Sequence, residues 1–484
     1  MSDNHVVKNF IWKYIERSFY QLGLALINII LARILVPEDF GELAVIMVFV
    51  NVAQTFVQQG LATALVKEET LDQRDITNVL VTNTSTAVIL YILFFIMAPF
   101  MAAFYKTPAL TWNIRFMSLT LLPGSVNAVQ NSIIVRTRKY KELCFANAGS
   151  VIASGVIGYI AAIHDMGVRA LIFQQFSFQL VVCIIMVPIT GIKLYRPKCN
   201  EKLKRMYGFG IKLMLSSFLN NLYVEIQTLI VGRVYSSTSV GYYNQGRTYP
   251  SLVINNINTT MNTILLPEFV NLSSKDNGIK NAMKNSLCLG TFIISPLLFG
   301  LFGVADNLIA VLLTDKWISC IPYMRLFCLG YIFTPLSTIN LQAYNAIGRS
   351  DIYLRNEIIK KVIGIFVLVV FMIMWHSPLA VAACFCLISP VCSMIDMRKS
   401  KKYFKYSFPE QLQDAVPSII TALVMMLAVM GLNFLQIPKL WLLIVQILAG
   451  IGIYLGIARL FNITGYVILV RLSRDLFIHK LNRK

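Results

Sequence analysis

Residues 77–103 read TNVLVTNTSTAVILYILFFIMAPFMAA, a stretch without a single charged side chain. As an α-helix it would extend about 40 Å, which exceeds the ~30 Å hydrocarbon core of a bilayer. It is also far longer than the roughly 10-residue alternating strands of a membrane barrel. Because lipid cannot satisfy backbone polar groups, the stretch predicts a transmembrane helix.

The composition extends this interpretation to the whole chain. Of its 484 residues, 57% are hydrophobic and only 14% are charged, and the mean hydropathy is +0.66. A soluble protein carries about 25% charged residues, so a soluble enzyme is excluded. The net charge of +20 does not indicate a nucleic-acid-binding protein, because the basic residues lie in short connectors between apolar runs. No nucleic-acid partner is therefore expected.

Apolar segments of similar length recur throughout the chain. The predicted fold class is all-α, a polytopic membrane protein with about 14 transmembrane helices. The predicted segments are residues 10–36, 40–65, 77–103, 110–134, 142–163, 168–192, 208–234, 240–266, 281–302, 318–345, 353–375, 378–397, 414–435 and 438–460.

The connectors between these segments predict the orientation of the chain. Basic residues concentrate at 136–141, 193–205, 349–355 and 398–405, which all follow even-numbered segments. The opposite connectors hold few cations. By the positive-inside rule, both termini face the cytoplasm. Attraction to anionic membrane lipids is a further expectation.

The first and second halves of the chain contain a repeat. Leu31-Ala-Arg-Ile34 aligns with Val231-Gly-Arg-Val234, and Phe40-Gly41 aligns with Val240-Gly241, at an offset of about 200 residues. Six helices per repeat preserve orientation, so we expect the repeats to be related by an axis along the membrane normal. Parallel repeats of this kind are common in alternating-access transporters.

A second similarity pairs Gln130…Arg138 with Gln342…Arg349. The repeat predicts an N-terminal six-helix lobe at residues 1–200 and a C-terminal six-helix lobe at 201–400. Residues 401–484 would form two additional helices and a cytoplasmic tail.

No residue pattern indicates catalysis or a bound cofactor. The sequence lacks a phosphate loop, an H-E-x-x-H motif and a G-x-S-x-G motif, and its nine cysteines show no metal-ligand spacing. We predict neither a catalytic residue nor a metal site. The function is expected to come from polar groups inside the membrane, where each ionisable side chain costs roughly 2.5–3.5 kcal/mol and needs a partner or a cavity.

Ionisable residues occur in the first and seventh predicted helices. Lys13 and Arg17 share one face of the first helix, and Lys212 has a similar depth in the second repeat. Glu16 lies beside them, and Glu225 lies deeper in the seventh helix. Snorkelling of Lys13 and Arg17 to the interface is the alternative explanation.

The eighth helix is unusually polar. Arg247 borders its polar stripe and lies at the depth of Glu225, so we expect these two residues to face one another or a shared aqueous space. A structural ion pair is the alternative for Arg247 and Glu225, and helix–helix contact is the alternative for the stripe. Polar residues at matching positions of the second helix are Asn51, Thr55 and Gln58, and the stripe itself contains Asn244, Thr248, Ser251, Asn255, Asn258 and Asn262.

A cavity lined by these residues would be cationic and rich in amides and hydroxyls. Lys13, Arg17, Lys212 and Arg247 would bind the phosphate of a sugar-bearing amphiphile, and the amide and hydroxyl residues would replace water around sugar hydroxyls. An organic cation would require the opposite charge balance.

Several stretches resemble lipid-linked oligosaccharide flippases, the O-antigen and exopolysaccharide translocases of the multidrug/oligosaccharidyl-lipid/polysaccharide exporter superfamily. The stretches are Leu31-Ala-Arg-Ile-Leu-Val-Pro-Glu-Asp-Phe-Gly41, Gln59-Gly-Leu-Ala-Thr-Ala-Leu-Val66, Leu313-Thr-Asp-Lys-Trp317 and Ala343-Tyr-Asn-Ala-Ile-Gly-Arg349. They are family-wide patterns around turns and contain no substrate-reading residue.

The resemblance implies two six-helix bundles around a central cavity, plus two C-terminal helices. It also implies movement of an undecaprenyl-diphosphate-linked repeat unit from the cytoplasmic to the periplasmic leaflet, with coupling to a proton or sodium gradient. Glu16 and Glu225 are the expected coupling residues. A polymerase and glycosyltransferases of the same pathway are the expected protein partners.

Two other functions remain open from the sequence. A cation-coupled multidrug exporter of the same superfamily would share the fold, although the cationic residues argue against it. A membrane polysaccharide polymerase or ligase is the other, and it would be expected to carry a large periplasmic loop that this chain lacks.

Overall fold

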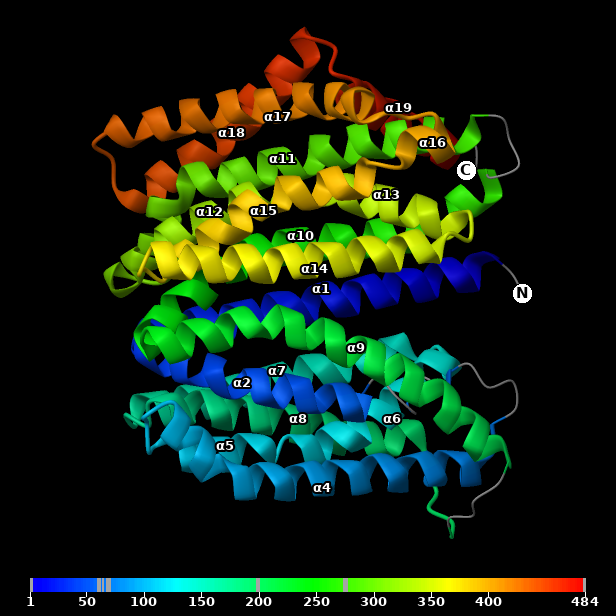
Figure 1. Cartoon of the computed structure of the whole chain (residues 1–484), viewed down its shortest axis with the longest axis vertical. Helices are drawn as coiled ribbons and strands as arrows, with labels where there is room; N and C mark the ends of the chain where they lie inside the picture. Colours follow the sequence, from blue (N-terminus) through cyan, green and yellow to red (C-terminus); the bar gives the residue numbers. More distant parts are fainter. Residues whose placement is uncertain are drawn as a thin grey trace. The chain divides into compact units, whose positions relative to one another are not determined.

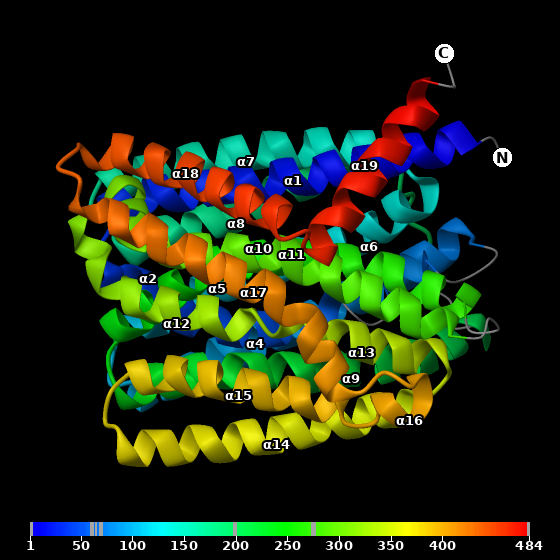
Figure 2. The same ribbon diagram turned by 90° about the horizontal axis from the view of Figure 1, so that it is seen from above.

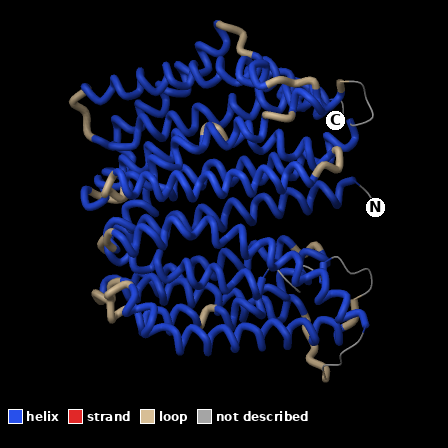
Figure 3. Tube along the Cα trace, in the orientation of Figure 1, coloured by secondary structure: helices blue, strands red, loops and turns tan. Residues whose placement is uncertain are grey.

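The computed structural model describes residues 3–58, 62, 65–66, 71–196, 201–272 and 277–481. These residues form helices joined by short connectors, and they contain no strand (Figure 3). The predicted all-α class is confirmed. Within this described part, nine helical segments have the length and hydropathy to cross a membrane, so the chain is a multi-pass membrane protein. The total of about fourteen transmembrane helices stays a prediction.

The chain divides into two compact units, Met1–Gly241 and Tyr242–Lys484. The first contains α1 (Asp3–Ile34), α2 (Pro37–Gln58), α4 (Gln73–Phe104), α5 (Leu110–Ser118), α6 (Leu121–Thr137), α7 (Tyr140–Ile163), α8 (Val168–Thr190), α9 (Glu201–Val234) and the first residues of α10 (Ser237–Leu272). The predicted lobe boundaries near residues 200 and 400 follow the repeat and stay a prediction.

The second unit holds the rest of α10 and all later helices. These are α11 (Gly278–Leu312), η1 (Asp315–Cys320), α12 (Ile321–Tyr331), α13 (Thr334–Ala346), α14 (Ser350–Met374), α15 (Leu379–Met397), α16 (Ser400–Phe404), α17 (Phe408–Gly431), η2 (Leu432–Phe434), α18 (Lys439–Leu460) and α19 (Thr464–Leu481).

Long helix-to-helix contacts build the first unit. Helix α1 lies along α7, and α7 lies along α8 (Figure 2). Helix α2 packs against α9, and its buried side chains Ile46 and Val50 join Ile114 and Leu121 in one hydrophobic core. These contacts place α2 and α9, which carry several of the predicted site residues, side by side.

In the second unit, α11 packs against α17, while α12, α13 and α14 all contact α15 (Figure 1). The core near α13 contains the buried rings of Phe269, Tyr344 and Phe404. Helix α17 begins with a capping box in which Ser407 and Glu410 satisfy each other's backbone N–H groups.

Two predicted helices are each divided in the structure, and the divisions match across the repeat. The segment predicted at 110–134 consists of α5 and α6, which meet two residues before Pro123. The segment predicted at 318–345 includes α12 and α13, which meet just before Pro335. A proline cannot donate a helical hydrogen bond, so it favours a helix start. By contrast, Pro296 lies inside α11 without ending it.

Candidate functional site

The first candidate residues lie on α1 in the first unit. The carboxylate of Glu16 accepts a hydrogen bond of 2.6 Å from Asn147 Nδ2 on α7. Arg17 is half-buried at the next position. The side chains of Lys13 and Lys212 lie outside the described residues. The α1–α7 contact therefore fixes the position of one of the two predicted coupling carboxylates.

A second polar group of the first unit lies between α2 and α9. Asn51 Nδ2 donates to Glu225 Oε1 over 3.0 Å. One turn further along α2, the Thr55 hydroxyl accepts from Asn221 Nδ2 at 2.7 Å and donates to the Asn51 carbonyl at 3.0 Å. Thr55 is only 2% exposed. The polar residues Asn51 and Thr55 of α2 therefore form a contact with α9.

Helix α9 is also fixed near its C-terminal end. The Tyr105 hydroxyl, just after α4, donates to the Leu229 carbonyl at 3.4 Å, and the Arg233 guanidinium lies 4.7 Å from the centre of the Phe104 ring. Burial raises the pKa of Tyr105 to about 12, although the nearby Arg233 lowers it. These contacts anchor the helix that carries Glu225.

The structure brings together Asn51, Thr55 and Glu225 from the predicted set, whereas Gln58 contacts Gln54 within α2 at 3.4 Å. Two partners were missed by the sequence analysis. Asn221 lies four residues before Glu225, on the same helical face, and this spacing could have indicated it. No local signal identifies Asn147, because its contact with Glu16 joins positions 131 residues apart.

The polar stripe of α10 lies mostly in the second unit. Near its start, the hydroxyls of Thr248 and Ser251 donate to the backbone carbonyls of Asn244 and Thr248 at 2.8 Å. Further along, Asn258 Oδ1 accepts from the Thr338 hydroxyl of α13 at 2.8 Å. Asn262 Oδ1 accepts from Gln342 Nε2 at 2.9 Å. For these two asparagines, the alternative explanation of the polar stripe is confirmed: they form contacts between α10 and α13.

Several polar residues of α10, including Asn262 beside its contact with α13, are exposed. A 36-residue helix is about 54 Å long, which exceeds the ~30 Å hydrocarbon core, and these positions lie in its second half. Exposed amides are costly wherever a helix faces hydrocarbon. The exposed polar residues are Asn255, Asn256, Thr260, Asn262 and Thr263.

Arg247 is half-buried beside this stripe. The neighbouring Gly246 allows close approach of α10 to α12, because a Cβ atom at this position would lie 2.7 Å from the Cβ of Tyr323. Arg247 belongs to the second unit and Glu225 to the first. Their predicted proximity therefore stays a prediction.

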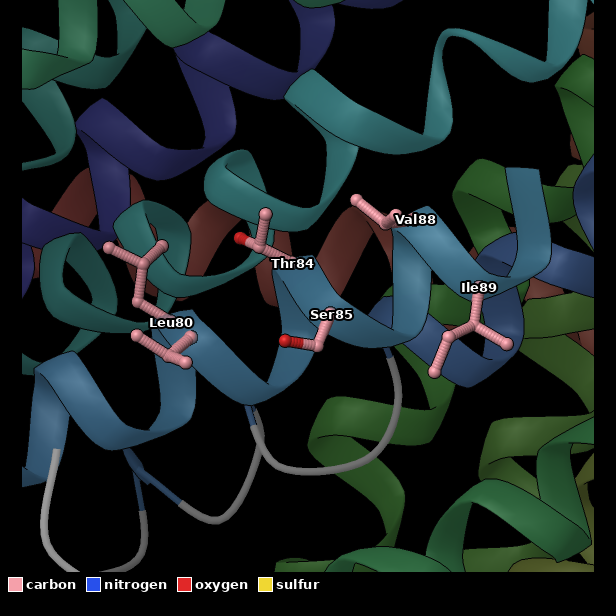
Figure 4. A pocket seen from close by; sticks show the side chains of 6 residues that line it. Leu80, Thr84, Ser85, Val88 and Ile89 are labelled. Carbon is pink, nitrogen blue, oxygen red and sulfur yellow. The ribbon is translucent and has the colours of Figure 1, made fainter. Parts of the chain in front are cut away.

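Two cavities in the first unit hold none of the predicted site residues. One has a volume of about 450 Å³ and lies along α4, where Leu80, Val88 and Ile89 line it together with the hydroxyls of Thr84 and Ser85 (Figure 4). The other, of about 350 Å³, lies beside Trp112 and Arg169. Their largely apolar linings fit acyl chains better than a diphosphate. No group of three metal-ligating side chains occurs in the described ranges.

The relatives of this chain include proteins named for the biosynthesis and transport of polysaccharides. Succinoglycan biosynthesis transport protein ExoT of Rhizobium meliloti is 25% identical over 339 residues, which cover 69% of this chain and 68% of that protein. Lipopolysaccharide biosynthesis protein WzxC of Escherichia coli is 22% identical over 387 residues, which cover 72% and 78%.

Among solved structures, the lipid II flippase MurJ in an inward closed conformation has a similar fold. Its TM-score is 0.73 at 16% identity, and the match covers 94% of this chain and 98% of that chain. At this identity the similarity concerns the fold alone.

A family described as "Polysaccharide biosynthesis protein" matches residues 30–322. The match is longer than half of the chain and extends from the end of α1 to the start of α12. The resemblance inferred from the sequence is confirmed at this level. The chain belongs to the polysaccharide biosynthesis protein family.

Proposed function

We propose that this protein is a flippase, not an enzyme. It moves an undecaprenyl-diphosphate-linked oligosaccharide from the cytoplasmic to the periplasmic leaflet by alternating access. The product serves the synthesis of a surface polysaccharide such as O-antigen, capsule or exopolysaccharide. The observation that carries the proposal is the exposed polar surface of α10 between residues 255 and 263, in a membrane protein of a polysaccharide biosynthesis family.

The physical reason is the cost of transferring a sugar–diphosphate head through hydrocarbon. Unpaired polar groups lose several kcal/mol on leaving water, and an oligosaccharide carries many hydroxyls. Amides and hydroxyls along α10 replace water around the sugars, while the polyprenyl tail stays in lipid. Rigid-body movement of the two repeats then transfers access from one leaflet to the other.

The proposed diphosphate ligands are Lys13, Arg17, Lys212 and Arg247. Cationic side chains bind phosphate oxygens through charge-assisted hydrogen bonds. Glu16 and Glu225 are the proposed coupling residues. Asn147 and Asn51 donate hydrogen bonds to these carboxylates.

The proposed location is the bacterial inner membrane with both termini in the cytoplasm. The basic connectors at 136–141, 193–205, 349–355 and 398–405 support this orientation. The glycosyltransferases that complete the lipid-linked repeat and the polymerase that consumes it are the proposed partners of the same pathway.

Expression in a bacterium that lacks the flippase of one surface polysaccharide tests the proposal. We expect polymer to reappear on the cell surface and the lipid-linked repeat no longer to accumulate. Growth in toxic organic cations should be unchanged. Resistance to such cations without restored polymer would instead identify a multidrug exporter.

A further inference from the structure

A cavity of about 350 Å³ lies between the first turns of α5 and α8 and holds none of the candidate residues described above. Trp112 is the third residue of α5, and Arg169 is the second residue of α8. Phe116 and Phe173 follow four residues later, about 6 Å further along their helices. All four side chains line the cavity, and the two phenylalanine rings meet with their centroids 5.8 Å apart. We name this cavity the α5–α8 pocket.

The α5–α8 pocket is amphipathic along its length. At the helix starts it presents the side chains of Arg169 and Trp112, and the latter is 59% exposed. Deeper in the pocket, the walls are the two phenylalanine rings and Ile172. The Arg115 guanidinium lies 5.2 Å from the centre of the Trp112 ring and 4.1 Å from that of the Phe95 ring, and these contacts hold the indole in place. Tryptophan and arginine at helix ends are typical of the membrane–water interface.

Arg169 supplies the positive charge of the pocket. Its side chain is exposed, and no other lining residue that the structure describes is charged. In the described part of the chain, Arg169 forms neither an ion pair nor a side-chain hydrogen bond. The exposed Asp165 of the preceding connector therefore does not pair with it. A guanidinium has five N–H donors, so water or an anion has to provide the acceptors.

The carboxylates near the pocket have other partners. Asp39 Oδ2 accepts a hydrogen bond from the Val36 backbone N–H at 3.2 Å, and Asp39 also bonds to the backbone N–H of Val168 at the start of α8. Glu42 Oε2 accepts from Asn113 Nδ2 at 3.5 Å. Neither carboxylate lines the pocket. The described lining thus carries one positive charge, which complements one negative charge on a ligand.

This charge and this shape fit a phospholipid with an anionic headgroup. A guanidinium binds a phosphodiester through charge-assisted N–H···O bonds, and the deeper aromatic and aliphatic walls accommodate an acyl chain. A soluble phosphate would make no use of the apolar walls. In a zwitterionic phospholipid, the ammonium group offsets the negative charge that Arg169 attracts.

The pocket also adjoins the core that supports α2. Ile172 lines the pocket and belongs to the same hydrophobic cluster as Ile114 of α5 and Ile46 and Val50 of α2. A lipid bound between α5 and α8 therefore contacts the edge of this core. Because the pocket exists only where the two helices are packed together, its ligand should stabilise the folded state by mass action.

We propose that the α5–α8 pocket binds one anionic phospholipid. Its phosphate bonds to Arg169, and the first part of an acyl chain lies against Phe116 and Phe173. By the positive-inside rule, the connectors at 105–109 and 164–167 face the periplasm, so the lipid belongs to the periplasmic leaflet. The pocket contains no residue proposed to bind the lipid-linked oligosaccharide, and its binding of phospholipid does not depend on the proposed function.

Native mass spectrometry of the detergent-purified full-length protein tests the proposal. The wild type should hold one molecule of phosphatidylglycerol about tenfold more tightly than Arg169→Ala does. Phosphatidylethanolamine with the same chains, and glycerol phosphate without chains, should bind both proteins alike. Equal affinities of the two proteins for phosphatidylglycerol overturn the proposal. It is also overturned if the variant loses as much affinity for phosphatidylethanolamine or for glycerol phosphate.

Two further variants separate the pocket from its surface charge. Lys106→Ala removes another exposed cation, from the connector before α5, and should leave binding of phosphatidylglycerol unchanged. Met166→Trp keeps Arg169 but places a larger side chain at a lining position that is 46% exposed. It should weaken binding as much as Arg169→Ala does. Wild-type affinity in Met166→Trp, or an equal loss in Lys106→Ala, would mean that charge alone attracts the lipid, and the pocket would be refuted.

Undecaprenyl phosphate distinguishes the membrane phospholipid from a polyprenyl lipid. It should bind the wild type and Arg169→Ala alike, because its proposed ligands lie elsewhere. A larger loss of undecaprenyl phosphate than of phosphatidylglycerol in this variant would assign the pocket to the polyprenyl lipid and overturn the proposal. Thermal unfolding provides a second measurement: phosphatidylglycerol should raise the unfolding temperature of the wild type more than that of Arg169→Ala. Equal increases would contradict binding at Arg169.

Discussion

Gly41 and Gly241 occupy equivalent positions in the repeat, and each packs against the first turn of the other's helix. A Cβ atom at Gly41 would overlap the backbone carbonyl oxygen of Ser237 and lie 3.0 Å from the Gly241 nitrogen. A Cβ atom at Gly241 would overlap the carbonyl oxygen of Pro37 and lie 3.3 Å from the Gly41 nitrogen. The contact is reciprocal, as expected for two copies of one motif, and it lies within the first unit.

Substitution of either glycine by alanine should destabilise the protein. The obstructing atoms belong to the backbone, so the two helix turns have to separate, at a cost of about 1–3 kcal/mol for each change. Thermal unfolding of the purified variants Gly41→Ala and Gly241→Ala measures the effect. Gly452→Ala in α18 is the matched control, because no atom lies within 4 Å of a Cβ there. Equal unfolding temperatures for all three variants would contradict the contact.

The hydrogen bond between Asn51 and Glu225 should contribute to stability as a pair. Asn51→Ala removes the amide that donates to the carboxylate, at an expected cost of about 1–3 kcal/mol. Glu225→Gln keeps an oxygen able to accept the bond and should cost less. A double-mutant cycle with Asn51→Ala and Glu225→Ala measures the coupling. Effects that add within about 0.5 kcal/mol would show that the two side chains do not interact.

Arg17 and Arg247 should both be needed for export of the polymer. Arg17→Ala and Arg247→Ala remove charges proposed to bind the diphosphate, so we expect both variants to reach the membrane but to export no polymer. Arg398→Ala, which changes an exposed cation at the end of α15, is the matched control and should export normally. Full export by both site variants would refute their assigned role.

The exposed side of α10 should be accessible to water. A cysteine in place of Asn255 should react with a membrane-impermeant thiol reagent above the level of the wild type. A cysteine in place of the adjacent Ile254, which is 1% exposed, should remain unmodified. Equal protection of both positions would mean that α10 faces no aqueous space, and the site would lose its physical basis.

The sequence was sufficient to predict the helical class, because uncharged stretches such as residues 77–103 leave no other structure in lipid. It also predicted the repeat, which the helix divisions before Pro123 and Pro335 support. It missed those divisions themselves. Apolar residues continue across Leu119 and Ile332, so hydropathy alone does not reveal where one helix ends and the next begins.

The candidate site was less predictable. The spacing of Asn258 and Asn262 placed both on one face of α10, but only the structure shows that α13 uses these residues as hydrogen-bond acceptors. The structure shows that Glu225 accepts a hydrogen bond from Asn51, which the sequence analysis did not predict. Long-range contacts of this kind depend on which helices pack together, and a helical pattern does not specify this. The ion pair between Lys360 and Asp396 escaped notice for the same reason, because these residues lie 36 positions apart.

Reconstitution gives the most direct test of the central claim. The purified protein is placed in vesicles that carry a lipid-linked oligosaccharide in both leaflets, and a membrane-impermeant reagent modifies the sugars that face outward. We predict that the modified fraction rises from about half to nearly all of the substrate, because the flippase brings inner-leaflet heads to the outer surface. A modified fraction that stays at the level of protein-free vesicles would contradict the account.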